Sequence, residues 1–205
     1  MAGPVDAVVL SSGGVKSLVA AATLGRATRP PLLFIDDGRP SIAQHHAAFV
    51  RQCEYMDAAR RLELAAPRLL VGDTDGAEAA PMGRLEFLAA AASRAARLGA
   101  RRLVWAVSVG EDFEAASRIA ELQVLIEHAI EVETGHSLRI ESPLLELTPP
   151  QIIEAGEQLQ APWRATRSCQ TSQPAPCGTC AGCVGRAAAF AAAGVEDPLA
   201  VHESA

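Results

Sequence analysis

Short apolar runs alternate with longer amphipathic stretches over the first half of the chain. Runs of five to seven residues without internal Gly or Pro predict strands at 5–10, 31–35, 67–71 and 101–107. The Ala-rich stretches between them predict helices at 15–26, 41–64 and 83–98. This order predicts a parallel sheet with helices on both faces, in which ligands bind at the carboxyl ends of the strands.

The second half continues the pattern and contains one clear helix start. A helix is predicted to about Thr134, followed by a short strand within residues 136–144. Thr148 is typical of an N-cap, with Pro149 in the first turn and Gln151 as its capping-box partner. We expect this helix to belong to the same α/β domain.

The composition changes at about Ala161. From there to Cys183 the chain is rich in Pro, Gly, Ser, Thr and Cys, and the tail returns to a helix that ends near Gly194. The expected fold class is therefore α/β, a doubly wound parallel sheet spanning residues 1–160. A C-terminal module at 161–205 is expected to pack on it.

Composition and charge narrow the range of partners. Hydrophobic residues make up 49% and charged residues 20% of the 205, which is enough apolar surface for a substantial core. The net charge of -6 argues against a broad nucleic-acid-binding face, which needs clustered Lys and Arg. Charges break the apolar stretches well before the ~18 residues of a membrane span. We expect a cytoplasmic protein with small-molecule partners and no direct nucleic-acid or membrane binding.

Four of the five cysteines, Cys169, Cys177, Cys180 and Cys183, lie within fifteen residues of one another. In a reducing compartment such a cluster indicates a metal before a disulfide. Their C-x7-C-x2-C-x2-C spacing can place four thiolates around one tetrahedral zinc ion with no open position, which indicates a structural site. An iron–sulfur cluster is the rival, although the spacing lacks the usual ferredoxin pattern. Cys53 stands alone in a predicted helix and is expected to be buried.

The only lysine of the chain, Lys16, lies in the glycine-rich stretch SSGGVKS after the first predicted strand. A strand that turns through glycines into a helix gathers backbone N–H groups into an anion site, and Ser12 and Ser17 can add hydroxyl donors. Glycine pairs also occur at such turns simply to let the chain reverse. The P-loop pattern of nucleoside triphosphatases fails, because no glycine stands five residues before Gly14.

The stretch is similar to the pyrophosphate-binding loop S-G-G-x-D-S of the ATP pyrophosphatase, or adenine nucleotide alpha hydrolase, superfamily, with Lys16 in the acidic position. The resemblance implies that the loop grips the β- and γ-phosphates of ATP while a substrate oxygen attacks the α-phosphorus, releasing pyrophosphate. The acidic side chain is associated with magnesium in that superfamily. Lys16 either pairs with the phosphates itself or marks a loop that has lost catalysis and keeps a binding or structural role.

Together with the cysteine cluster, the chain resembles the 7-cyano-7-deazaguanine synthase family along nearly its whole length. That family converts 7-carboxy-7-deazaguanine and ammonia to the nitrile on the way to queuosine. The matching stretches are SSGGVKS, FIDDGR (34–39), GRLEFLAAAA (83–92), VGED (109–112), SPLLELTPPQIIEAGEQL (142–159) and TRSCQTSQPAPCGTCAGCVGRAAAFAAAGVEDP (166–198).

The departures lie where the chemistry would occur. Asp37, Arg39 and Pro40 stand where the family usually shows D-Y-G-Q-R, and Leu85 stands in place of an Asn. After Glu111–Asp112 the family carries a Gly-Tyr-Pro-Asp-Cys segment associated with the deazapurine pocket, and FEAASR here has none of it. The scaffold therefore matches the family better than the active site does.

The resemblance implies three sets of site residues besides the metal cysteines. ATP binding is expected from Leu10, Ser11, Ser12, Gly13, Gly14, Val15, Lys16, Ser17 and Asp36. Catalysis is expected from Lys16, Arg84 and Asp112, and substrate binding from Arg84, Glu111, Asp112 and Arg118.

Several of these residues also have a plainer interpretation. Arg84 can be a solvated cation, Asp36 a turn former, and Glu111 with Asp112 the cap of the next helix. His45 and His46 lie just beyond FIDDGR, where family members also show a His, although most lone histidines on helices are surface residues.

The expected function is an ATP-dependent ligase that adenylates the carboxylate of 7-carboxy-7-deazaguanine and captures it with free ammonia. Zinc is the expected structural metal, ATP a substrate, Mg2+ its companion, and a homodimer the assembly that the resemblance suggests. Two alternatives stay open. One is a divergent relative that adenylates another carboxylate, and the other is a non-catalytic nucleotide-binding or scaffold protein.

Overall fold

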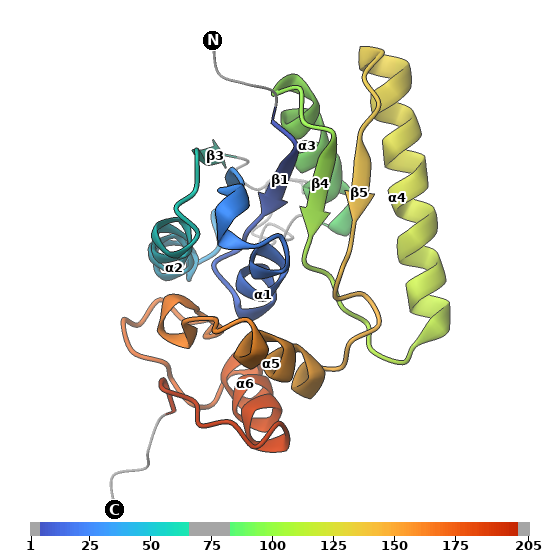
Figure 1. Cartoon of the computed structure of the whole chain (residues 1–205). Coiled ribbons are helices and arrows are strands. Elements are labelled where there is room, and N and C mark those ends of the chain that lie inside the picture. The colour runs from blue at the N-terminus through green and yellow to red at the C-terminus, as the bar shows by residue number, and fades with distance from the viewer. Residues whose placement is uncertain (1–4, 66–82, 201–205) are drawn as a thin grey trace, which may run out of the picture.

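A computed structural model describes residues 5–65 and 83–200, which form a sheet with helices on both faces (Figure 1). The sheet has the order β3-β2-β1-β4-β5 with all neighbours parallel, and its strands are β1 Ala7–Leu10, β2 Leu32–Asp36, β3 Arg61–Ala65, β4 Arg102–Trp105 and β5 Arg139–Glu141. The helices are α1 Val15–Thr23, α2 Ile42–Tyr55, α3 Arg84–Arg97, α4 Phe113–Thr134, α5 Pro149–Gln158 and α6 Ala181–Ala192, with 3-10 turns at Arg26–Thr28 and Trp163–Ala165. The predicted α/β class and parallel sheet are confirmed.

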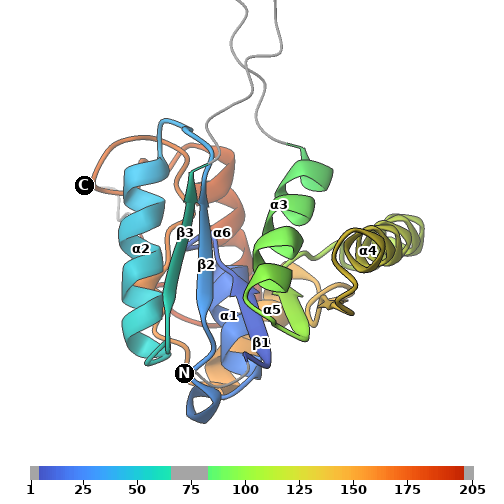
Figure 2. The same cartoon turned by 90° about the horizontal axis from the view of Figure 1, so that it is seen from above.

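Alternate residues of the strands face two different helical layers, as the pleat of a strand requires. Val9 of β1 belongs to a buried cluster with residues of α1, α2, α5 and α6, whereas Val8 and Leu10 belong to a second cluster with residues of α3 and α4. Figure 2 shows β2 and β3 between α2 on one side and α3 on the other. The sheet is therefore buried on both faces, and its carboxyl edge is left for ligands.

One predicted helix is wrong in its second half. The helix expected over 41–64 ends at Tyr55, and Arg61–Ala65 forms the edge strand β3. Asp57 adopts a left-handed φ of 46°, which breaks the helix. In β3, Leu62 is buried while its neighbours are exposed, a period of two that fits a strand. The strand predicted at 67–71 lies outside the described residues.

The other predicted elements are confirmed, with shifts of a few residues at their ends. α1 ends earlier than predicted, at Thr23, and Gly25 with a φ of 76° begins a 3-10 turn there. The start of α5 is capped as expected, because the Thr148 backbone N–H donates to Gln151 Oε1 at 2.8 Å.

The segment after residue 160 shares a core with the sheet domain. Trp163 and Phe190 lie in the same buried cluster as α1, with their ring centroids 5.2 Å apart. A Cβ at Gly156 of α5 would lie 2.0 Å from the Trp163 ring, so only glycine allows this packing. The Arg186 guanidinium lies 4.8 Å from the centre of the Phe190 ring and forms a buried ion pair with Asp197 at 2.7 Å. The division at residue 160 stays a prediction.

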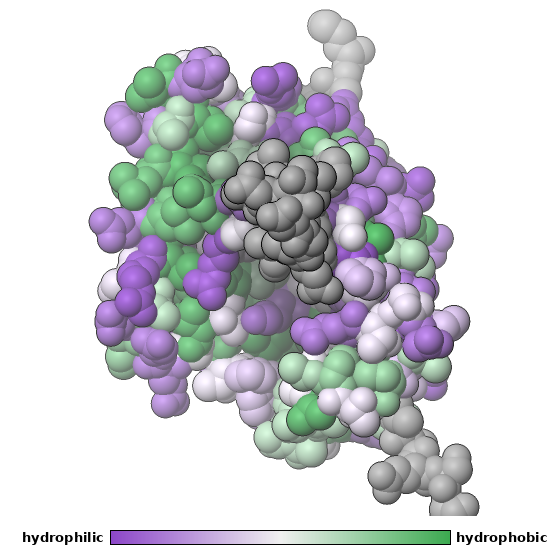
Figure 3. All heavy atoms as spheres, turned by 180° about the vertical axis from the view of Figure 1, so that it is seen from behind, coloured by the Kyte–Doolittle hydropathy of each residue, from purple (hydrophilic) through white to green (hydrophobic). Residues whose placement is uncertain are grey.

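Large hydrophobic side chains remain exposed on α4. Phe113, Val124, Leu125 and Val132 are each at least 60% exposed. Figure 3 shows hydrophobic side chains gathered on the side of the molecule where α3 and α4 lie. Within the described ranges, no helix has the length and apolar character needed to cross a membrane.

Candidate functional site

A cavity of about 200 Å³ opens at the carboxyl ends of β1, β2 and β4. Leu10 ends β1, Ile35 precedes the last residue of β2, and Trp105 ends β4, and all three line the cavity. The chain leaves β1 for β2 on one side, and β4 lies on the other, so this is the topological switch point of the sheet. The position agrees with the site predicted from the order of strands and helices.

The glycine-rich stretch forms the polar wall of this cavity. Ser11, Ser12 and Ser17 line it, and Ser17 Oγ accepts the Ser12 backbone N–H at 3.0 Å. Gly14 is the N-cap of α1, so the first free N–H groups of the helix lie at the same place. Hydroxyls and helix N–H groups together suit an anion such as a phosphate.

Gly13 is the residue of the stretch that no other amino acid can replace without strain. Its φ is 73°, and an added Cβ would lie 2.2 Å from the His45 carbonyl oxygen. The loop is thus pressed against the first turn of α2.

Two buried polar side chains of α2 hold the loop backbone. Gln52, fully buried, accepts from Ser11 Oγ at 2.8 Å and donates to the Gly14 carbonyl at 3.0 Å. The His45 ring lies 3.0 Å from the Ser12 carbonyl through Nδ1. The sequence pointed to a functional role for a histidine at this place but to none for Gln52. The available signal was that both residues, seven apart, fall on the apolar face of an amphipathic helix.

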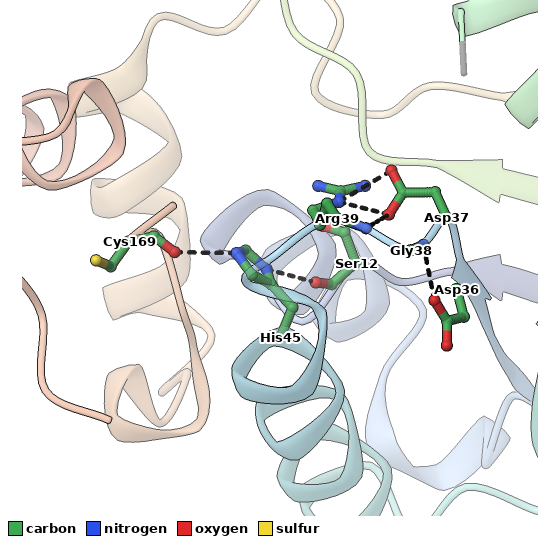
Figure 4. A network of polar contacts seen from close by, with 7 residues as sticks. All are labelled: Ser12, Asp36, Asp37, Gly38, Arg39, His45 and Cys169. Carbon is green, nitrogen blue, oxygen red and sulfur yellow. Dashed lines mark hydrogen bonds and ion pairs between the residues drawn. The ribbon is translucent and has the colours of Figure 1, made fainter. Parts of the chain in front are cut away.

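Figure 4 shows how His45 is placed between the loop and the cysteine segment. Its Nε2 lies 3.2 Å from the Cys169 carbonyl oxygen. Burial lowers the pKa of His45, and the charges of Arg39 and Arg167 lower it further, although its contacts with the two carbonyls oppose this. The neutral ring is therefore favoured, and it can donate to only one of the two carbonyls at a time.

Arginine side chains make one side of the cavity positive. Arg84, at the start of α3, and Arg39 both line it. Arg39 is fixed by Asp37, which accepts from its Nε at 2.7 Å, and its guanidinium lies 6.0 Å from the centre of the Phe87 ring. Burial opposes ionisation of Asp37, but its hydrogen bonds with Arg39 outweigh this and lower its pKa. Arg39 was not predicted as a site residue.

Lys16 is exposed at the start of α1 and lines a neighbouring hollow of about 500 Å³. Apolar residues of α5 and α6, among them Ile152 and Phe190, form much of that hollow, and Ser108 and Ser168 add hydroxyls. Partial loss of hydration lowers the pKa of Lys16, and the positive charge of Arg84 lowers it further. Arg84 therefore lines the switch-point cavity and Lys16 the neighbouring hollow, close enough for their charges to interact.

Four other predicted residues, Asp36, Glu111, Asp112 and Arg118, do not line the cavity. Asp36 accepts from the Gly38 N–H at 2.9 Å, as a turn-forming aspartate does. Asp112 caps α4 by accepting from the Ala115 N–H at 2.9 Å, and exposed Arg118 pairs with Glu114 at 2.8 Å. Glu111 is also exposed. Their functional assignments stay predictions.

The four clustered cysteines come together as the spacing predicts. The Sγ atoms of Cys169, Cys177, Cys180 and Cys183 all lie within 4.8 Å of one another, and two of the pairs are 4.0 Å apart. A zinc ion with Zn–S distances of about 2.3 Å holds its thiolates about 3.8 Å apart, so the observed arrangement fits a tetrahedral ion. The same atoms could also hold an iron–sulfur cluster.

Donors around the sulfur atoms fit thiolates. Backbone N–H groups of Gln170, Cys177 and Cys180 each lie 3.4 Å from a cysteine Sγ. Burial opposes ionisation of Cys169, but hydrogen bonds from Thr171 and the Cys177 backbone lower its pKa to about 5. Burial raises the pKa of Cys183 to about 12. A bound cation would compensate the cost of ionising it.

Arg167 shapes the loop between the first two cysteines. Its buried guanidinium donates to the carbonyls of Gln173 at 2.6 Å and Pro174 at 2.9 Å.

Cys53 is buried as predicted, and burial raises its pKa to about 12, which makes its thiol inert.

Comparisons with known proteins point to one family. A family model described as "Queuosine biosynthesis protein QueC" matches residues 72–194. The 7-cyano-7-deazaguanine synthase of Chloroherpeton thalassium is 30% identical, covering 94% of this chain and 95% of that protein, and the enzyme of Chlorobaculum parvum is 28% identical over the same shares.

Among solved structures, the NMN synthetase of Francisella tularensis is similar with a TM-score of 0.48 and 15% identity, covering 94% of this chain and 79% of that one. The family model spans more than half of this chain, and the relatives align along nearly all of it. The chain therefore belongs to the QueC family of queuosine biosynthesis proteins.

Proposed function

We propose that this protein is an ATP-dependent ligase that adenylates the carboxylate of 7-carboxy-7-deazaguanine and converts it with ammonia to the nitrile. The observation that carries the proposal is the phosphate-type loop at the mouth of the switch-point cavity, facing Arg39 and Arg84. The cavity offers an apolar slot between Phe34, Ile35 and Trp105 for a purine base. Its polar wall suits the phosphates attached to that base.

The proposed reaction begins with attack of a carboxylate oxygen on the α-phosphorus of ATP. The bond from the α-phosphorus to the β-phosphate bridging oxygen breaks, and pyrophosphate leaves with the electron pair. Ser12, Ser17 and the α1 N–H groups would hold the leaving pyrophosphate, and Lys16 and Arg84 would neutralise its growing charge. Mg2+ would supply further neutralisation when bound with ATP.

Ammonia then attacks the acyl carbon, and AMP leaves with one oxygen of the original carboxylate. The product of this step is an amide, so a nitrile requires loss of the second oxygen. We propose a second adenylation, on the amide oxygen, after which loss of AMP and the nitrogen-bound protons gives the nitrile. Each nitrile would then consume two ATP.

The hollow beside Lys16 is the proposed place for the acyl substrate. It shares Ser168 and Gln170 with a third hollow, which in turn shares Arg39 and His45 with the cavity. A substrate there would have its carboxylate near the loop while its ring contacts Ile152 and Phe190.

The cysteine cluster is proposed to bind zinc in a structural capacity. Four thiol ligands would leave no open position for a substrate or water, so zinc there takes no chemical step. A homodimer, suggested by the family resemblance, stays part of the proposal.

A second candidate is an enzyme that adenylates a different carboxylate. It is favoured by the stretch that follows Glu111 and Asp112, which begins the helix α4 and lacks the family's substrate segment. The first assay measures pyrophosphate release from ATP with 7-carboxy-7-deazaguanine and ammonium each present or absent. Release that requires this acid supports the first proposal, and release only with another acid supports the second. Absence of release with every acid contradicts both.

A further inference from the structure

The segment that leads into the cysteine cluster lies directly beside the phosphate loop. The Arg167 backbone N–H donates to the Gly13 carbonyl at 2.9 Å. The Gln52 amide donates to the carbonyls of both Gly14, at 3.0 Å, and Ala165, at 3.2 Å. A Cβ on Gly13 would collide with the His45 carbonyl oxygen. The loop backbone therefore has little room to move independently of this segment.

One side chain joins the two sites. The ring of His45 contacts the Ser12 carbonyl of the loop through Nδ1, at 3.0 Å, and the Cys169 carbonyl through Nε2, at 3.2 Å (Figure 4). His45 is 8% exposed, so water competes little for either contact. Cys169 supplies one of the four thiols, so the carbonyl that Nε2 contacts belongs to a residue of the cysteine cluster.

We propose that His45 is a positioning residue that couples metal binding at the cysteine cluster to nucleotide binding at the phosphate loop. The inference rests on the proposed ATP and zinc binding. A bound metal fixes the Cys169 backbone, which fixes the His45 ring and through it the Ser12 carbonyl. Since coupling of binding free energies is reciprocal, a bound nucleotide must strengthen metal binding by the same factor.

The reciprocal effect can be measured without removing the metal beforehand. Zinc-loaded protein is titrated with a competing chelator, with and without a saturating non-hydrolysable ATP analogue, and the zinc affinity is obtained at equilibrium. We expect the analogue to raise the zinc affinity of the wild-type chain by about fivefold or more. An unchanged affinity would overturn the inference.

Two conservative variants separate the contacts of His45. The amide nitrogen of Asn takes the place of Nδ1, and that of Gln takes the place of Nε2, so His45→Asn and His45→Gln each keep one contact. We expect both to bind analogue and zinc but to reduce the coupling to less than about twofold. If both variants keep the wild-type coupling between zinc and analogue binding, His45 does not couple the two sites.

A matched control is His136→Asn. His136 also contacts a backbone carbonyl, that of Ala100 at 2.6 Å, but at the amino end of β4, opposite the cavity. This variant should keep the wild-type coupling, and its loss there would overturn the assignment to His45. Calorimetry of the analogue on the same samples separates the two proposals. If the wild-type chain binds no analogue, the proposed function is contradicted together with the coupling. If it binds the analogue but shows no coupling, only the role of His45 is contradicted.

Discussion

Lys16 puts a positive charge at the position where the loop pattern that SSGGVKS resembles carries an acid. It lies at the start of α1, and the neighbouring charge of Arg84 contributes to its lowered pKa. If Lys16 neutralises part of the phosphate charge that Mg2+ would otherwise neutralise, replacing Lys16 should change the Mg2+ concentration that the protein needs. We predict that Lys16→Asp raises the KM for ATP about tenfold or more at low Mg2+ and recovers as Mg2+ is added.

Lys16→Ala serves as the comparison, because it removes the cation without supplying a metal ligand. It should show the same rise in KM and no recovery with Mg2+. Initial rates over a range of Mg2+ concentrations decide the matter. If Lys16→Asp is more active than the wild type at every Mg2+ concentration, the lysine impairs the loop and our interpretation is wrong.

The lowered pKa of Lys16 also predicts a pH effect. Below this pKa the ammonium is charged and binds phosphate, and the charge is lost as the pH rises through it. ATP affinity should therefore fall on the alkaline side at a lower pH than for Lys16→Arg, whose guanidinium stays charged. If ATP affinity falls at the same pH in the wild type and in Lys16→Arg, Lys16 is not a phosphate ligand.

Gly13 offers a test of the loop backbone. Gly13→Ala must place a side chain at a φ of 73° and against the His45 carbonyl, and we expect it to lower the free energy of unfolding by about 2 kcal/mol or more. Gly135→Ala is the control, since Gly135 has a left-handed φ of 67° with open space around it and should cost about 1 kcal/mol. Urea unfolding measures both. Equal losses would mean that the loop is not pressed against α2.

At the level of elements, patterns that repeat were predictable and patterns that depend on tertiary contact were not. The parallel sheet with helices on both faces followed from the alternating runs, and the capping box at Thr148 identified a helix start. The strand β3 was missed because its alternation is short and directly follows a helical stretch. Gln52 and Arg39 were missed as site residues because only the fold brings them against the loop and the cavity.

The C-terminal helix α6 is fixed to the rest by a buried ion pair. Arg186 donates two hydrogen bonds to Asp197 and a third to Thr166. We predict that Asp197→Asn lowers the free energy of unfolding by about 3 kcal/mol, because it leaves the buried guanidinium without its partner charge. Arg118→Ala, which breaks the exposed pair with Glu114, should change it by less than about 1 kcal/mol. Similar losses in the two variants would contradict this assignment.

The same pair predicts a dependence on acid. Burial would raise the pKa of Asp197, but the hydrogen bonds from Arg186 lower it below the ordinary value. A carboxyl with a lowered native pKa stabilises the fold above its unfolded pKa, about 3.9, and loses this contribution as the pH falls through the native pKa. Asp197→Asn should therefore weaken the acid dependence of unfolding. If the acid dependence of unfolding is the same in Asp197→Asn as in the wild type, it arises from groups other than Asp197.

The cysteine cluster makes a prediction about metal content. We expect the wild-type chain to contain one zinc ion, and Cys177→Ser to lose most of it while Cys53→Ser keeps it, because Cys53 lies outside the cluster. Elemental analysis of proteins purified in parallel measures this. Iron with acid-labile sulfide in place of zinc would establish the rival iron–sulfur cluster.

For the whole molecule, the family and the fold followed from the sequence because the loop and the cysteine spacing are local patterns. The arrangement of the site did not, since the loop, α2 and the cysteine segment lie side by side only after folding. The substrate is the remaining question at this scale. The departures near Glu111 and Asp112 are on the exposed start of α4, and they do not line the switch-point cavity.

The central claim, adenylation of a carboxylate by this loop, is tested most directly by isotope transfer. 7-Carboxy-7-deazaguanine labelled with ¹⁸O in its carboxylate is incubated with ATP and ammonium, and the nucleotide products are analysed by mass spectrometry. We predict AMP that carries one heavy oxygen from the acid, with two such AMP for each nitrile formed. Unlabelled AMP, or ADP as the nucleotide product, would contradict the mechanism.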